Sequence, residues 1–264
     1  MVFKIIVVTH NRVDVCRSHT LAMLRDNHVP AELITLLVHN EEQKANYEDG
    51  IPKDLYNNIM VTNTNDGCYG QLNFLTDYYE EGVRIVKLDD DISYVYEIAD
   101  NYNLVKSSNL LNFIDDGFRL CDQYGAKLFG LYPCTNPYFV CKQKLYSTDL
   151  RFAVGSFMGL IIDKSNILDL NIKIKGDYQY AIQAYINHGA VIRLNRVCHK
   201  YHINKNVGDR TTVMVNDARI LVEKYPSYVR HNLRRNMNNI NKGEILLIRN
   251  PKIKSLNKVY GSKT

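Results

Sequence analysis

Short runs of apolar residues alternate along the N-terminal half of the chain with polar turns and with stretches of helical periodicity. The runs predict strands and the periodic stretches predict helices: strands at 4–8, 32–40, 56–63 and 83–91, helices at 13–27 and 71–81. Nearly continuous apolar runs rich in β-branched residues are typical of strands buried on both faces. Strands that alternate with helices predict an α/β fold with a mostly parallel, mixed central sheet.

The C-terminal half continues the same pattern. It predicts strands at 126–133, 157–163 and 190–197, a turn or short helix at 165–170, and helices at 177–188 and 212–224. There is no internal repeat and no linker of low complexity. We therefore expect one domain over residues 1–223, with a Rossmann-like nucleotide-binding half, followed by a C-terminal extension at 224–264 that packs on or beside it.

Charge distinguishes the extension from the domain. The whole chain of 264 residues has a formal charge of +5, and residues 224–264 hold ten Lys/Arg against the single acid Glu244. Such a segment is either a solvated basic tail or an edge that faces a polyanion. Both interpretations stay open at the level of the sequence.

The cellular compartment is predicted from three features that the sequence lacks: a membrane-spanning run, a secretory signal pattern and paired cysteines. No apolar run approaches the ~18 residues that span a bilayer, and the N-terminus has no secretory signal pattern. The six cysteines have no CxxC spacing, which argues against a zinc knuckle or a redox pair. We expect a cytoplasmic protein, with no membrane partner.

Polar residues follow three of the predicted strands. They are Thr9–Arg12, His39–Glu41 and Asp89–Asp91. Open α/β sheets bind ligands beyond the carboxyl ends of their strands, so these segments are expected to meet in one crevice.

Asp89, Asp90 and Asp91 are the strongest chemical feature. Three adjacent carboxylates repel one another unless a cation compensates, and Mg²⁺ or Mn²⁺ suits carboxylates together with substrate phosphates. In extended backbone, Asp89 and Asp91 point to one side, toward a metal, and Asp90 to the other, toward a ribose or sugar. The alternative is an acidic turn in which one aspartate caps the segment 92–98.

The order of motifs resembles a known fold class. THNR (9–12), GCYGQLNF (67–74) and KLDDDI (87–92) are similar to the pattern of GT-A glycosyltransferases. LFGLYPCTNPYFV (128–140), VGSFMGLII (154–162), GDYQY (176–180) and RLNRVCHKYHINKNVGD (193–209) resemble the TET-associated glycosyltransferases of phages and some eukaryotes. The likeness covers residues 3–210.

The resemblance implies donor-binding residues. The nucleotide would be bound by Thr9, His10, Asn11 and Arg12, with the Arg12 guanidinium forming a bidentate contact with a phosphate. Gln71 and Asn73 would contact the base and the donor sugar, and Asp89 and Asp90 complete the donor site. An ordinary loop histidine at position 10, and a plain turn with a helix start at 67–73, are the alternatives.

Catalytic roles are also implied. Asp177 would act as general base toward the acceptor hydroxyl, although it also suits the start of a helix. His202, with His199 as second choice, would add a metal ligand to Asp89 and Asp91, and Lys205 would neutralise the departing nucleoside diphosphate. A surface role is the alternative for the loop histidines. With no evident nucleophile, inversion is expected.

These inferences combine into one functional hypothesis. We expect an enzyme that uses Mn²⁺ or Mg²⁺ to transfer a sugar from a nucleotide-sugar donor, a UDP-sugar, to the hydroxyl of a 5-hydroxymethylpyrimidine in DNA. If the gene belongs to a bacteriophage, the host cytoplasm is the site of action. Three aromatic residues are candidates for stacking on the acceptor base: Tyr132, Tyr138 and Phe139.

Two alternatives remain. The same fold would also serve a polysaccharide, lipid-linked glycan or protein acceptor. A non-catalytic DNA-binding module on a GT-A-like fold is the other, because fold does not imply activity.

Overall fold

The computed structural model describes residues 2–64, 67–99, 103–201, 210–233 and 243–250. Within these ranges ten strands form one mixed sheet in the order β3-β2-β1-β4-β9-β7-β10-β5-β6, with β8 beside β10. The strands of this sheet are β1 (Lys4–Val8), β2 (Ile34–Val38), β3 (Asn58–Val61), β4 (Arg84–Asp89), β5 (Ile92–Ile98), β6 (Leu104–Lys106), β7 (Leu128–Tyr132), β8 (Tyr146–Ser147), β9 (Phe157–Ile161) and β10 (Ile192–Tyr201).

The N-terminal half of the sheet is parallel. Strand β1 pairs with β2 and β4, and β2 pairs with β3, all in parallel. All five residues of β2 are buried, which explains its continuous apolar sequence. Strand β9 then enters antiparallel between β4 and β7, so the other half is mixed. The predicted α/β fold class with a mixed central sheet is confirmed.

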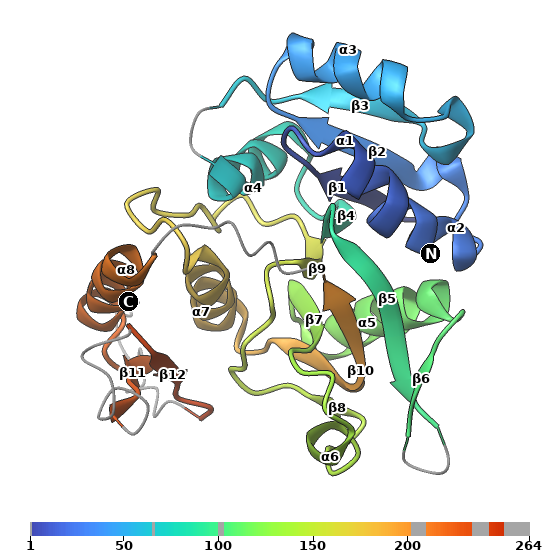
Figure 1. The fold of residues 1–264 in the computed structure, drawn as a ribbon. Helices are drawn as coiled ribbons and strands as arrows, with labels where there is room; N and C mark the ends of the chain where they lie inside the picture. Colours follow the sequence, from blue (N-terminus) through green and yellow to red (C-terminus); the bar gives the residue numbers. More distant parts are fainter. Residues whose placement is uncertain (1, 65–66, 100–102, 202–209, 234–242, 251–264) are drawn as a thin grey trace, which may run out of the picture.

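Helices cover both faces of the sheet (Figure 1). They are α1 (Val13–Cys16), the π-helical η1 (Arg17–Leu21), α2 (Ala22–Asp26), the 3-10 turns η2 (Ala31–Leu33) and η3 (Lys53–Leu55), α3 (Glu41–Gly50), α4 (Gly67–Tyr78), α5 (Leu110–Tyr124), α6 (Pro137–Val140), α7 (Gly176–His188) and α8 (Thr211–Lys224). The predicted helix at 13–27 is α1, η1 and α2 in succession.

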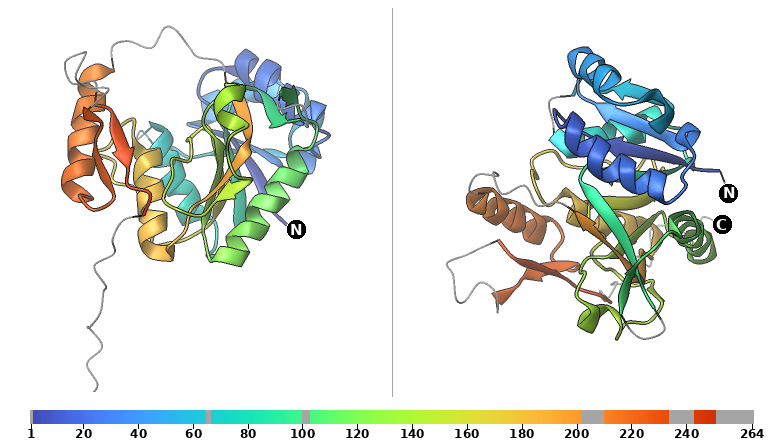
Figure 2. Two further views of the ribbon diagram at one scale, coloured as in Figure 1. Left: turned by 90° about the horizontal axis from the view of Figure 1, so that it is seen from below. Right: turned by 45° about the vertical axis from the view of Figure 1, so that its right-hand side comes forward.

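Two apolar clusters sandwich the sheet. Ile5 and Val7 of β1 join the cluster under α1, α2, α3 and α5, whereas Ile6 and Val8 join the cluster under α4, α7 and α8. This is the alternation expected of a strand buried on both sides. The left view of Figure 2 shows the sheet between the two helical layers, with α8 outside α7.

The C-terminal segment forms a small antiparallel pair, β11 (Val229–His231) and β12 (Ile245–Leu247). Val229 and Ile245 are buried in the same cluster as α7 and α8. The domain boundary at 223/224 stays a prediction. No helix of the described ranges is long and apolar enough to cross a membrane.

Three local outcomes bear on the predictions. Residues 165–170 form a turn without a helix. Segment 92–98 is strand β5, so no helix follows the acidic triplet for an aspartate to cap. Helices α3 and α5 lie where no helix was predicted.

Candidate functional site

The acidic triplet forms the tight connection between β4, which ends at Asp89, and β5, which begins at Ile92. Asp89 and Asp91 line a cleft of about 740 Å³ beyond the carboxyl ends of β1 and β4. Asp90 points the other way and is fully buried. The triplet thus presents two carboxylates to the cleft and one to the protein interior.

Asp90 anchors the turn to the end of β1. Its carboxylate accepts hydrogen bonds from the Thr9 hydroxyl, at 2.6 Å, and from Arg12 Nε, at 3.1 Å, and it also pairs with Arg12 Nη2. Burial raises the pKa of Asp90 to about 6, while Thr9 and Arg12 act to lower it. Asp90 is therefore placed as a structural partner of Arg12, away from the cleft where the donor contact was expected.

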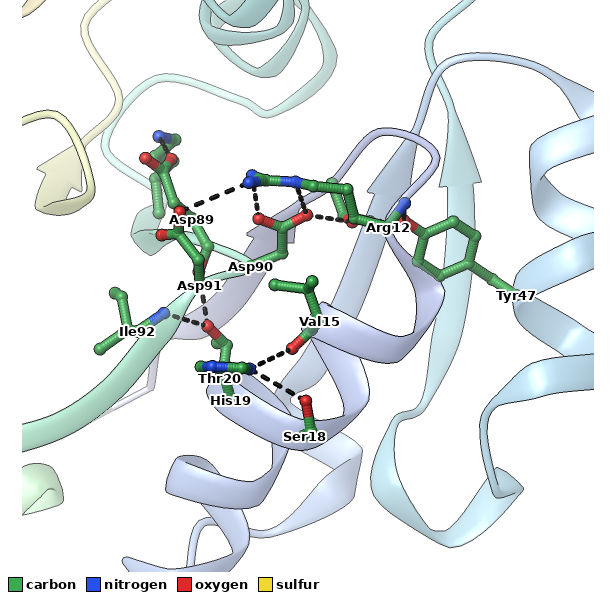
Figure 3. A network of polar contacts seen from close by, with 12 residues as sticks. Arg12, Val15, Ser18, His19, Thr20, Tyr47, Asp89, Asp90, Asp91 and Ile92 are labelled. Atoms are coloured by element: carbon green, nitrogen blue, oxygen red, sulfur yellow. Dashed lines mark hydrogen bonds and ion pairs between the residues drawn. The ribbon is translucent and has the colours of Figure 1, made fainter. Parts of the chain in front are cut away.

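Tyr47 of α3 completes this anchor. Its hydroxyl accepts from the Arg12 backbone N–H at 3.0 Å and contacts the Thr9 hydroxyl. Because Thr9 donates to Asp90, Tyr47 is the donor in its contact with Thr9. One chain of hydrogen bonds thus joins α3, the end of β1 and the acidic turn (Figure 3).

The π-helical segment η1 holds the other side of the turn. The hydroxyl of the fully buried Thr20 donates to the Asp89 carbonyl at 2.7 Å and accepts from the Ile92 N–H at 3.0 Å. Figure 3 shows the dashed lines from this hydroxyl to Ile92 and to the acidic turn. Single π-helical turns recur at functional sites, and here the turn carries the side chain that closes the acidic loop.

Of the segment Thr9–Arg12 after β1, some residues line the cleft and one lies at the surface. Thr9, His10 and Arg12 line the cleft, together with His39 after β2. The His10 and His39 rings lie 6.0 Å apart, and His10 Nδ1 is 3.0 Å from the Gln43 amide nitrogen. Asn11, with a φ of 53°, is exposed and is not among the lining residues.

Helix α4 contributes one predicted residue to the cleft. Gln71 lines the cleft, as does Tyr69. Asn73 instead fastens α4 to the loop before α7, because its amide donates to the Leu168 carbonyl at 3.0 Å and accepts from the Leu168 N–H at 2.8 Å. The structure therefore separates Gln71, at the cleft, from Asn73, which has a structural contact.

Asp177 in the first turn of α7 also lines the cleft. It accepts hydrogen bonds from the N–H groups of Gly155, at 3.3 Å, and Tyr178, at 2.9 Å. Burial raises its pKa to about 6, against the lowering effect of these two bonds. A carboxyl group that titrates near neutrality at a cleft suits a general base.

Glycine is required at position 176, before Asp177, for a steric reason. A Cβ at Gly176 would lie 2.6 Å from the Tyr69 ring, so only glycine lets this ring pack on the start of α7. This contact joins α4 to α7 on one side of the cleft.

Lys87 is a cleft residue that the sequence analysis missed. Its ammonium group pairs with Asp89 and donates to the Gly155 carbonyl at 2.7 Å. The side chain is buried in β4 and links the acidic turn to the loop that holds Asp177. The available signal was a cation inside the apolar run VRIVKL, since a buried lysine requires an acidic partner.

His199 on β10 lies behind the cleft wall. Its Nε2 is 2.7 Å from the hydroxyl of Ser156, which lines the cleft, while its buried Nδ1 has no hydrogen-bond partner among the residues that the structure describes. Burial lowers the pKa of His199 to about 4, so the ring is neutral at pH 7. The predicted residues His202 and Lys205 lie outside the described residues, between Tyr201 and Arg210, which both line the cleft.

The residues present suit a divalent ion held jointly with a substrate. No group of three or more His, Cys, Asp or Glu in the described ranges forms a complete metal site. Asp89 and Asp91 supply two carboxylates, and burial and the neighbouring Asp89 raise the pKa of Asp91. One or two carboxylates plus substrate phosphates is how proteins commonly bind Mg²⁺, so this donor set fits.

Comparisons with solved structures identify the fold. No protein-family model matches the chain, and no curated protein matches it. S. aureus TarS (chain 1-349, also solved with UDP) is 15% identical with a TM-score of 0.52, covering 84% of this chain and 66% of that one. The mannosyltransferase PcManGT of Pyrobaculum calidifontis, solved with GDP-Man and Mn²⁺, is 12% identical with a TM-score of 0.58. The match covers 85% of this chain and 63% of that one.

GalNAc-T7, solved with UDP, GalNAc and Mn²⁺, is 13% identical with a TM-score of 0.53, and the match covers 86% of this chain and 49% of that one. The chain thus spans about two thirds or less of each of these proteins. It has the GT-A glycosyltransferase fold that they share.

Proposed function

We propose that the protein is a metal-dependent glycosyltransferase that uses a nucleotide-sugar donor. The observation that carries the proposal is that Asp89, Asp91 and Asp177 line one cleft at the carboxyl ends of the strands. The fold supports it, because UDP, or GDP-Man with Mn²⁺, is bound in solved structures of the same fold.

The donor occupies the side of the cleft formed by the strand ends and α4. Four of the predicted donor residues line it: Thr9, His10, Arg12 and Gln71. We propose a UDP-sugar as donor, in line with TarS and GalNAc-T7. A divalent ion at Asp89 and Asp91 supplies charge neutralisation for the leaving diphosphate. Lys87 keeps the Asp89 carboxylate in place.

The acceptor is activated by Asp177. Its carboxylate takes the proton of the acceptor hydroxyl as that oxygen bonds to the anomeric carbon and the bond from this carbon to the diphosphate breaks. Tyr178 and Gly155 fix the carboxylate through their N–H groups. A base on the opposite side from the leaving group gives inversion of the anomeric centre.

We propose DNA that carries a 5-hydroxymethylpyrimidine as the acceptor. The basic segment at 224–264 supports a polyanionic partner, since Lys/Arg contacts to phosphates give affinity independent of sequence. A base in duplex DNA has to be flipped out to reach Asp177. Two of the predicted stacking residues, Tyr138 and Phe139 of α6, are 61% and 50% exposed.

The test is mass spectrometry of nucleosides after incubation with a panel of nucleotide sugars and Mn²⁺. The acceptors are hydroxymethylated DNA, plain DNA and simple glycans. A new glycosylated nucleoside only in the first arm supports the proposal. Transfer to glycans alone contradicts the acceptor, and DNA binding without any donor turnover contradicts the activity.

Substitutions in the acidic turn test the site itself. Asp89→Asn and Asp91→Asn are expected to lower donor turnover about a hundredfold, because each removes a carboxylate that would hold the divalent ion, and that ion would neutralise the departing diphosphate. Asp14→Asn is the matched control, since its carboxylate is exposed and forms an ion pair with Arg17. Full donor turnover by both Asp89→Asn and Asp91→Asn in the presence of metal would contradict the proposal.

A further inference from the structure

Three arginine side chains lie near one another outside the cleft lining, and none of them belongs to the donor site. Arg193 lies on β10, Arg151 in the loop before β9, and Arg249 just after β12. Backbone contacts bring these segments together: the Leu150 N–H donates to the Arg249 carbonyl at 3.2 Å, and Arg193 pairs with Ser147 of β8. We call Arg151, Arg193 and Arg249 the arginine cluster.

The charge of the cluster is not balanced by the carboxylates around it. Asp149 is the acid that acts on Arg193, and it is already bonded to Arg151 Nε at 2.6 Å. Arg193 is only 8% exposed and makes no ion pair within the described residues. Burial lowers the pKa of Arg193 to about 10, and Arg151 and Arg249 add to this effect. A buried cation without a paired anion is costly, so the site favours an anionic ligand.

The Arg193 guanidinium is held in a fixed orientation. Its Nε donates to the Asn195 amide oxygen at 2.8 Å, and its Cζ lies 4.8 Å from the centre of the Tyr132 ring. Asn195 is itself fixed by its bond to the Ser147 hydroxyl at 2.6 Å. The other guanidinium nitrogens are therefore preorganised as a donor fork, the geometry that binds phosphate oxygens in pairs.

The arginine cluster is connected to the cleft through the chain segment that carries Arg151. Gly130 pairs with Met158 and Leu88 with Phe157, so Tyr132 and Asp89 end at the same edge of the sheet, on either side of β9. The segment 149–156 runs from Arg151 to Gly155 and Ser156 in the cleft wall. Between them Phe152 stacks on Tyr178, next to Asp177, with ring centres 4.4 Å apart.

We propose that the arginine cluster binds a backbone phosphate of the acceptor DNA strand and so places the reacting nucleotide at Asp177. This inference rests on the proposed acceptor and names the groups that hold it. Three guanidinium groups with a single shared carboxylate match a phosphodiester, which keeps its charge at every working pH. The exposed Arg249 and the recessed Arg193 provide an entrance and a base for the phosphate.

The experiment measures DNA binding directly, by fluorescence anisotropy of a labelled hydroxymethylated oligonucleotide at several salt concentrations. Arg193→Gln, Arg151→Gln and Arg249→Gln are compared with Arg219→Gln, which removes an equal charge from an exposed ion pair on α8. We expect each cluster variant to bind about tenfold more weakly and to reduce the salt slope by about one, with the control unchanged.

A second measurement uses inorganic phosphate alone. Phosphate is expected to raise the melting temperature of the wild-type protein, at ionic strength matched with chloride, and to do so less in Arg249→Gln. Arg249 is exposed, so this variant tests the inference even where Arg193→Gln fails to fold.

The outcomes separate the two proposals. DNA binding by the wild-type protein with no loss in Arg151→Gln and Arg249→Gln overturns the role of the cluster and leaves the acceptor in place. Donor hydrolysis without any DNA binding by the wild-type protein overturns the acceptor. Weaker binding by the cluster variants, with donor hydrolysis unchanged, supports the cluster.

Discussion

The aspartates in and around this cleft lie in different environments although three of them are adjacent and identical in sequence. Of three successive aspartates, Asp89 and Asp91 face the cleft while Asp90 is buried against Arg12 and Thr9. A fourth carboxylate, Asp177, has the raised pKa of about 6 that suits a proton acceptor. Identical chemistry is thus assigned different roles by burial and by hydrogen-bond partners.

The raised pKa of Asp177 predicts a pH profile. A base must be deprotonated to act, so the rate at saturating donor should rise about tenfold per pH unit below 6 and level off above it. Asp177→Asn should lower the rate by about a hundredfold or more. Donor binding measured over the same range is the control, because Asp90 also has a pKa of about 6. A flat rate profile between pH 5 and 8 would contradict the assignment.

At the scale of elements, the acidic turn is shaped by the helix after β1. The π-helical η1 directs the Thr20 hydroxyl to both backbone ends of the turn, at Asp89 and Ile92. A turn without this bridge would leave a buried carbonyl and a buried N–H unsatisfied, at a cost of about 1–3 kcal/mol each.

Thr20→Val should therefore weaken metal use and not only stability. Valine has the same shape without the hydroxyl, so the turn relaxes, and we expect the Mn²⁺ concentration for half-maximal activity to rise about tenfold. Thr20→Ser should restore it. Thr76→Val is the control, since that buried hydroxyl bonds only to Leu72 in its own helix, at 3.1 Å. A change in melting temperature with unchanged metal dependence would contradict this role.

Much of the sheet was predictable from sequence, and the reason is burial. Strands β1, β2 and β4 are flanked by helices on both faces, so most of their residues are apolar, with Lys87 in β4 as a charged exception. Helix α3 was not predictable from periodicity: its sequence is almost wholly polar, and it is fixed by the buried Tyr47 and by Asn40 as N-cap. Helix α5 does carry apolar residues at helical spacing, and its signal was overlooked.

The candidate site was predictable only in part. The predicted alternation separates Asp90 from Asp89 and Asp91, as the turn in the structure also does. Nothing local shows that Thr9 and Arg12 are the partners of Asp90. Lys87 and the arginine cluster depend on contacts between distant segments. Their partners are assembled by the order β4-β9-β7-β10, which the sequence pattern does not specify.

At the scale of the whole molecule, a helix from the C-terminal part supports the proposed base. The fully buried Asp217 of α8 accepts the N–H groups of Lys173, Ile174 and Lys175, at 3.1, 2.7 and 3.1 Å. These residues lead directly into Gly176 and Asp177. The position of Asp177 thus depends on the packing of α8 against α7.

Asp217→Asn should reduce turnover from a distance. The new amide group faces N–H donors, so at least one hydrogen bond is lost and residues 173–175 shift. Because Asp177 follows these residues, kcat should fall about ten- to hundredfold with the donor KM unchanged. Asp169→Asn is the control, because it breaks another link from α8, the ion pair of Asp169 with Lys224 at 2.9 Å, near the surface. Equal effects of the two substitutions on kcat would contradict the role of Asp217.

The contact of Arg12 with Asp90 also restricts how this protein can diverge. Loss of Arg12 alone would leave the Asp90 carboxylate buried without its paired cation, whereas Arg12 itself is partly exposed and also lies 3.5 Å from Asp91. Among descendants of this sequence, an aspartate at position 90 is therefore expected only where position 12 carries a cation. The middle letter of the acidic triplet thus depends on a residue far away in the chain.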